Sequence, residues 1–94
     1  MFSLFSRKSS HDGRKRVADG AVLLDVRTRE EFADGHVEGA LNIPVQELSA
    51  RLHELRKGQN VVVYCRSGGR SASAAQILRT RGHDVLDIGP MSAW

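Results

Sequence analysis

The segment VVVYCRSGGRS, residues 61–71, decides the fold, because it places a cysteine between a predicted strand and a predicted helix. Three valines and a tyrosine precede Cys65 and predict a buried strand at residues 61–64. Two glycines then let the backbone turn before an alanine-rich segment, residues 71–81, that is typical of a helix. Backbone amides that converge at such a turn bind anions, and the helix N-terminus beyond it stabilises a thiolate.

Apolar runs and amphipathic segments alternate on both sides of this loop. Thr28 and Glu31 have the spacing of a capping box and mark the start of a helix. The pattern predicts strands at residues 21–26, 40–43, 61–64 and 84–88, with helices at 28–34, 45–55 and 71–81 between them. This alternation predicts an α/β fold with a parallel sheet and right-handed crossovers. In such sheets ligands bind beyond the carboxyl ends of the strands, and Asp25 and Cys65 lie at two of those ends.

The composition is that of one globular domain. The chain has 94 residues, of which 40% are hydrophobic and 27% charged. Its single cysteine cannot form an internal disulfide, so a reducing compartment is expected, and we predict a cytoplasmic protein. No apolar run has the roughly 18 residues that a membrane-spanning helix requires.

The N-terminal residues differ from the rest of the chain. We predict a flexible basic tail at residues 1–12 and a folded domain at residues 13–94. An apolar patch at Phe2, Leu4 and Phe5 precedes the first charges, the reverse of a secretory signal, so either a frayed terminus or a weak membrane or partner anchor would explain it. The net charge is +3, but much of the excess lies in and near this tail, and nucleic-acid binding is not expected.

Several chemistries are open to the Cys65 loop. Free cysteines are often buried structural residues, but the coincidence of Cys65 with glycines, Arg66 and Arg70 at one turn favours a functional site. The four histidines are scattered, so we expect neither a metal nor a cofactor. Cysteine phosphatase loops have an arginine six positions after the cysteine, whereas Arg70 lies five positions after Cys65. The smaller ring suits a single sulfur atom, which leaves phosphatase or arsenate reductase activity as the weaker alternative.

From residue 21 to residue 94 the chain resembles the single-domain rhodaneses, which carry sulfur as a cysteine persulfide. The matching segments are LLDVR at residues 23–27, EEF at 30–32, GH at 35–36, GALNIP at 39–44, the cysteine loop at 65–71, Gly89 and Trp94. The resemblance implies a three-layer α/β/α sandwich on a parallel sheet of strand order 3-2-4-5-1. The family's first, edge strand is not evident, because residues 13–19 are more typical of a helix. We therefore expect four strands and an uncovered edge that could pair with another copy.

The resemblance also assigns roles to residues. Cys65 is the nucleophile and persulfide carrier, while Arg66 and Arg70 bind a dianionic donor and favour the thiolate. The residues expected to surround the outer sulfur are Ser67, Gly68, Gly69, Arg70 and Ser71, although Ser71 could equally be the helix cap. Asp25 and Arg27 are expected to form a structural ion pair beside the loop. His36 and Trp94 are expected to have structural roles.

These roles predict a thiosulfate sulfurtransferase with a ping-pong mechanism. Sulfur would pass from thiosulfate, or a similar sulfane-sulfur donor, to Cys65 and then to cyanide or a thiol. The alternative is a persulfide relay that delivers sulfur to a partner protein with little small-molecule turnover; the basic tail would then be its docking element.

Overall fold

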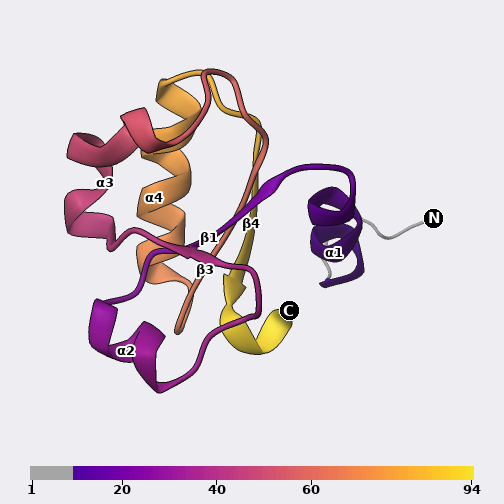
Figure 1. Cartoon of the computed structure of the whole chain (residues 1–94), viewed down its shortest axis with the longest axis vertical. Coiled ribbons are helices and arrows are strands. Elements are labelled where there is room, and N and C mark those ends of the chain that lie inside the picture. The colour runs from indigo at the N-terminus through magenta and orange to yellow at the C-terminus, as the bar shows by residue number, and fades with distance from the viewer. Residues whose placement is uncertain (1–9) are drawn as a thin grey trace.

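The computed structural model describes residues 10–94 as four strands and four α-helices (Figure 1). The strands are β1 Val22–Asp25, β2 Leu41–Asn42, β3 Val61–Cys65 and β4 Val85–Pro90. The helices are α1 Ser10–Ala18, α2 Arg29–Asp34, α3 Val45–Arg51 and α4 Gly69–Thr80, with 3-10 turns η1 Leu52–Glu54 and η2 Met91–Ala93. Residues 10–12, the end of the predicted tail, begin α1, and the apolar patch at Phe2, Leu4 and Phe5 lies outside the described residues.

The four strands form one parallel sheet in the order β2-β1-β3-β4. The predicted α/β fold and the four predicted strands are confirmed, and the order is the expected one without its edge strand. Where that strand would precede β1, the described chain forms helix α1. Within the ladder, Asp25 at the end of β1 lies opposite Tyr64, so the ends of β1 and β3 are neighbours.

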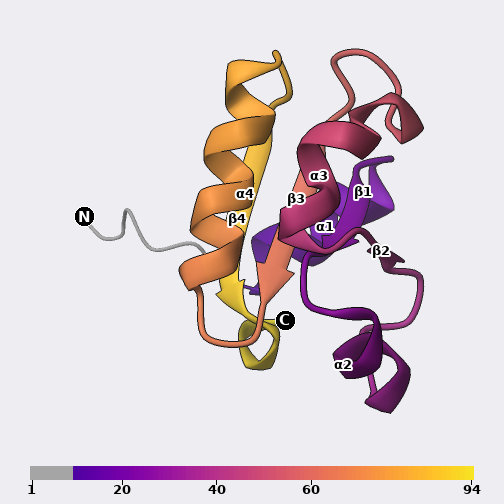
Figure 2. The same ribbon diagram turned by 90° about the vertical axis from the view of Figure 1, so that its left-hand side faces the viewer.

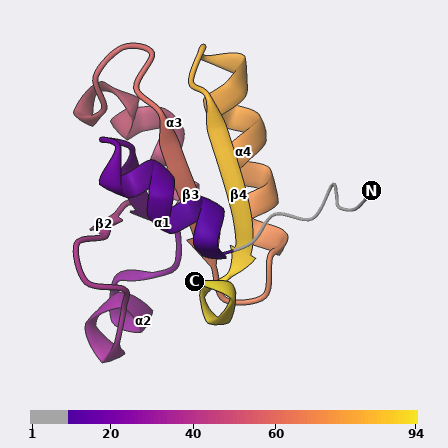
Figure 3. The same cartoon turned by 90° about the vertical axis from the view of Figure 1, so that its right-hand side faces the viewer.

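Helices cover both faces of the sheet (Figures 2 and 3). Alternate strand residues serve the two faces: Leu24 and Val63 pack with α3 and α4, whereas Leu23 and Val62 pack with α1 and the C-terminal turn. Helix α1 approaches closely because Gly13 has no side chain; a Cβ there would lie 3.3 Å from the Trp94 ring. The two packed layers place the carboxyl ends of β1 and β3 next to each other at one edge of the sheet.

The start of α4 and the end of β4 are among the boundaries that differ from the sequence-based expectation. Helix α4 begins at Gly69, two residues before position 71, and its N-cap is Gly68, so the prediction that Ser71 caps the helix is wrong. Gly68 takes a left-handed conformation (φ +107°) that a side chain would strain, and no pattern based on polar caps detects such a start. Strand β4 continues to Pro90 through a bulge, where the register moves from Val63–Asp87 to Tyr64–Gly89.

Strand β4 has a neighbour on only one side within the sheet, as expected. Side chains form hydrogen bonds with some of the backbone groups of this strand. The Arg79 guanidinium donates to the Val85 carbonyl oxygen (3.0 Å), and the Asp87 carboxylate accepts from the Gly89 amide (2.9 Å). Such side-chain contacts reduce the backbone groups that another strand could pair with. Pairing of this edge with a second copy stays a prediction.

Candidate functional site

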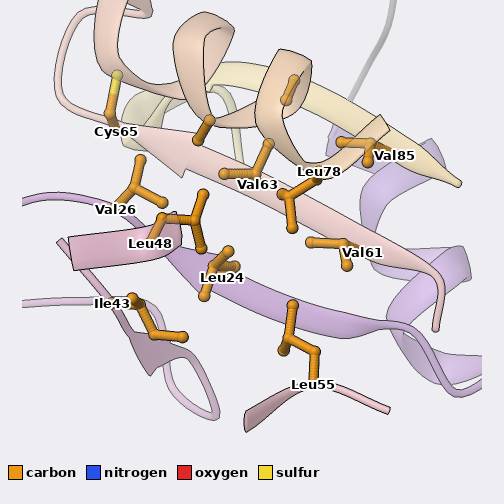
Figure 4. Close-up of a cluster of buried hydrophobic side chains, with 12 residues drawn as sticks. Leu24, Val26, Ile43, Leu48, Leu55, Val61, Val63, Cys65, Leu78 and Val85 are labelled. Atoms are coloured by element: carbon orange, nitrogen blue, oxygen red, sulfur yellow. The ribbon is translucent and has the colours of Figure 1, made fainter. Parts of the chain in front are cut away.

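Cys65 ends β3 and lies beneath the turn that leads into α4. Its side chain belongs to the apolar cluster under α4, at the end nearest this turn (Figure 4). The sulfur accepts a hydrogen bond from the Gly68 amide at 3.0 Å. Cys65 has 0% exposed surface, so the residues of the turn cover its sulfur.

The hydrogen bonds around Cys65 favour its thiolate. Burial raises the pKa of the Cys65 thiol, but hydrogen bonds from the Ser71 hydroxyl and from the amides of Ser71, Gly68 and Ser67 outweigh it. The net pKa is therefore lower than that of an ordinary cysteine. The prediction that a converging loop ionises Cys65 agrees with this direction. Arg66 and Arg70 were also expected to favour the thiolate; the largest causes are burial and these hydrogen bonds, while the charge of Cys65 contributes to the raised pKa of Arg70.

Replacing Ser71 by alanine is expected to raise the pKa of Cys65 and slow its alkylation at neutral pH. The hydroxyl has one proton, which it donates to the Gly68 carbonyl oxygen (3.1 Å) or to the sulfur. A hydrogen bond to a charged group is worth about 1.5–3 kcal/mol, so its loss should be measurable. Ultraviolet thiolate absorbance against pH measures the pKa directly. Ser73→Ala, on the exposed side of α4, is the matched control; equal titrations of the two variants would contradict the role of Ser71.

Glu31 joins helix α2 to the cysteine loop. Its carboxylate accepts two hydrogen bonds from Arg70, at 2.7 and 3.0 Å, and lies 3.8 Å from Arg66. The same side chain completes the predicted capping box with Thr28, which is confirmed. Hydrogen bonds from Arg70 and Thr28 lower the pKa of Glu31 to about 2. Glu31 was not predicted as a site residue, because the capping box already explained it and nothing local links it to a loop 39 positions away.

Asp25 and Arg27 form the structural ion pair that was expected. The Asp25 carboxylate accepts from the Arg27 backbone amide (2.9 Å) and from its guanidinium, the shortest contact being 2.7 Å. Both residues are buried, with Asp25 fully so. The guanidinium also donates to the Gly35 carbonyl oxygen (2.7 Å), which fixes the end of α2. Burial and a hydrogen bond to Asp25 raise the pKa of Tyr64 to about 12, so its phenol stays neutral.

An open cleft of about 430 Å³ lies beside the cysteine loop. Arg66 contributes to its lining from the loop, with a side chain that is 77% exposed, and Arg27 and Glu31 also line it. The full lining consists of Arg27, Glu31, Asp34, Gly35, Arg66, Met91 and Ser92. Arg70, which was expected to face the donor together with Arg66, is not in this lining and is paired with Glu31 instead.

The other residues singled out from the sequence are two loop positions, Ser67 and Gly69, and two residues expected to be structural, His36 and Trp94. Ser67 and Gly69 are exposed. His36 stacks on Phe32 (ring centroids 3.6 Å apart) and hydrogen bonds to its carbonyl oxygen, an arrangement that matches a structural role. Trp94 packs against the sheet beneath α1. Within residues 10–94, no three His, Cys, Asp or Glu side chains lie close enough to hold a metal ion, and no helix is long and apolar enough to cross a bilayer.

Comparison with known proteins defines the class of this fold and site. Residues 9–94 match the profile of the rhodanese-like domain. The fold superimposes on a rhodanese-like domain protein from Staphylococcus aureus with a TM-score of 0.80, at 27% identity, over 96% of this chain and 91% of that one. The chain is 39% identical to a sulfurtransferase of Allochromatium vinosum, over 85% of its own length and 78% of the relative's. It is also 39% identical to thiosulfate sulfurtransferase PspE of Escherichia coli, over 68% and 64% of the two lengths.

The chain therefore belongs to the rhodanese-like domain family, and sulfurtransferases are among its relatives. The predicted family and three-layer fold are confirmed. For most of the curated relatives the chain spans less than two thirds of their length, for example 37% of a transcriptional regulator of Mycobacterium tuberculosis.

Proposed function

We propose that this protein is a sulfurtransferase that moves sulfane sulfur from thiosulfate, or a similar donor, through a Cys65 persulfide to cyanide or a thiol. The observation that carries the proposal is the sulfur of Cys65, which lies at the N-terminus of α4 with its pKa lowered by loop hydrogen bonds. An open cleft lies beside this loop, and Arg66 in its lining is an exposed cation for an incoming anion. A single unpaired thiol is typical of proteins in a reducing compartment, which supports the proposal of a cytoplasmic location.

The reaction takes place in two half-reactions. The Cys65 thiolate attacks the outer sulfur of thiosulfate, the sulfur–sulfur bond of the donor breaks, and sulfite leaves with the electron pair. The product is a Cys65 persulfide, whose outer sulfur carries the negative charge. Amides of the loop, including that of Gly68, stabilise this charge as they do the thiolate. An acceptor then attacks the outer sulfur, and the Cys65 thiolate is restored as the leaving group.

A persulfide relay is the second candidate, and two observations favour it. The sulfur of Cys65 has no exposed surface, which would protect a stored persulfide from water and small thiols. One relative, 35% identical over 77% of this chain, is a putative sulfur carrier protein of Bacillus subtilis. In a relay the protein would load sulfur once and release it mainly to a partner protein.

Turnover with thiosulfate and cyanide distinguishes the two candidates. An enzyme produces many equivalents of thiocyanate per Cys65, measured as its coloured iron complex, whereas a relay forms the persulfide but transfers its sulfur to cyanide only slowly and so produces little thiocyanate. The Cys65→Ser variant supplies the background rate. Failure of the wild-type protein to form any persulfide with thiosulfate, or with another sulfane-sulfur donor, would contradict both candidates.

A further inference from the structure

Glu31 pairs with Arg70, one of the two arginines expected to bind a donor. Arg70 donates two hydrogen bonds to the Glu31 carboxylate, and only 32% of its side chain and 21% of that of Glu31 are exposed. A bidentate arginine–carboxylate pair of this geometry holds the guanidinium in one orientation. Arg70 is therefore directed at α2 and not at the cleft.

Charges in the cleft lining cancel. Arg27 and Arg66 contribute two positive charges, while Glu31 and Asp34 contribute two negative ones. The Arg27 charge is already matched by buried Asp25, and Arg66 lies 3.8 Å from Glu31. Asp34 forms no ion pair with any residue in the 10–94 range that the structure describes. A cleft of this kind attracts a doubly charged anion weakly, although the whole chain is basic.

We infer that Glu31 is a specificity-determining residue, which holds Arg70 away from the cleft and so favours singly charged sulfane-sulfur donors over the thiosulfate dianion. The inference rests on the proposed function and names the donor class that this site prefers. Thiol persulfides and thiosulfonates have the required single charge. Arg66 remains as the one exposed loop cation, which is sufficient for a monoanion.

Glu31→Gln is the variant that separates the charge of Glu31 from its structural role. Glutamine keeps the capping box, because its amide oxygen can still accept from the Thr28 backbone N–H. Its NH₂ group takes the place of Oε2 and cannot accept from Arg70, so the charged bidentate pair becomes one neutral hydrogen bond to the amide oxygen, and the guanidinium is freer to turn toward the cleft. Glu30→Gln is the matched control: it removes the same charge from the adjacent, exposed position of α2, which makes no bond to the loop.

Donor kinetics measure the preference. We compare thiosulfate with benzenethiosulfonate, a monoanion that transfers its outer sulfur in the same way and leaves as benzenesulfinate. For Glu31→Gln the KM for thiosulfate is expected to fall about five- to tenfold, with kcat changed less than about twofold. The KM for benzenethiosulfonate should fall less than about twofold, and Glu30→Gln should change neither KM by more than that. An unchanged or higher KM for thiosulfate, or equal shifts for both donors, would overturn the inference.

A binding measurement keeps this test independent of turnover. In the Cys65→Ser background, thiosulfate affinity is followed by NMR titration with and without Glu31→Gln. Tighter binding of about five- to tenfold in the double variant is expected, and equal affinities would refute the role of Glu31. If the wild-type protein transfers sulfur from neither donor, the proposed function fails, while the titration still decides whether Glu31 excludes the dianion.

Discussion

Replacing Cys65 by serine is expected to lower sulfur transfer by at least about a hundredfold, because a serine hydroxyl at neutral pH is neither ionised nor able to hold a sulfane sulfur. Serine has nearly the same shape, and the Gly68 amide that contacts the sulfur at 3.0 Å can donate to its oxygen instead. The fold should therefore persist, with the unfolding free energy changed by no more than about 1–2 kcal/mol. Thiocyanate formation and thermal unfolding of both proteins measure the two effects.

The outcome separates a role in chemistry from a role in packing. Cys65 is also a member of the apolar cluster beneath α4, so an unfolded variant would leave loss of activity ambiguous. Cys65→Ala, which removes the sulfur and adds no polar atom, serves as the second variant. Retention of more than a few per cent of wild-type activity in either folded variant would show that Cys65 is not the nucleophile.

Asp25→Ala is expected to cost about 3–5 kcal/mol of unfolding free energy, the largest stability effect we predict. The reason is that Arg27, which is only 5% exposed, would keep its charge and lose the carboxylate that accepts from its guanidinium at 2.7 Å. The Gly35 carbonyl oxygen, which also accepts from this guanidinium, neutralises no charge. Urea unfolding of the wild-type and variant proteins measures the difference.

Two controls show whether burial is the cause. The exposed pair Arg29–Glu47 is also bidentate, at 2.6 Å, yet Arg29→Ala should destabilise the protein far less than Asp25→Ala because solvent screens the pair. The double variant Asp25→Leu with Arg27→Met removes both buried charges and should be more stable than Asp25→Ala. The single variants Asp25→Leu and Arg27→Met complete the comparison. If the double variant loses as much unfolding free energy as these two single variants added together, Asp25 and Arg27 are not energetically coupled.

Much of the fold could be predicted from local pattern. Apolar runs at residues 61–64 and 84–88 and the capping box at Thr28 each depend on neighbours in sequence, and the structure contains all three. The start of α4 was placed two residues late, because its N-cap is a left-handed glycine and no polar side chain marks it. The bulge in β4 likewise depends on how that strand meets β3.

The residues of the cysteine loop could be predicted from the sequence, but the contacts of their side chains with the rest of the chain could not. Cys65 and the glycines are contiguous in sequence, so the loop could be recognised from the sequence alone. The contact between Arg70 and Glu31 joins two charged side chains that are 39 positions apart, and charged surface residues have no periodicity that reveals their partners. As a result, the arginines were both assigned to the donor, whereas the structure divides them: Arg66 lines the cleft and Arg70 binds α2.

The most direct test of the central claim, that Cys65 carries the transferred sulfur, is the intact mass of the protein after incubation with thiosulfate, followed by peptide mapping. The predicted result is a gain of one sulfur atom on the peptide that contains Cys65, absent from Cys65→Ser and reversed by cyanide. An unchanged mass with every sulfane-sulfur donor tried, or a sulfur adduct that persists in Cys65→Ser, would contradict it.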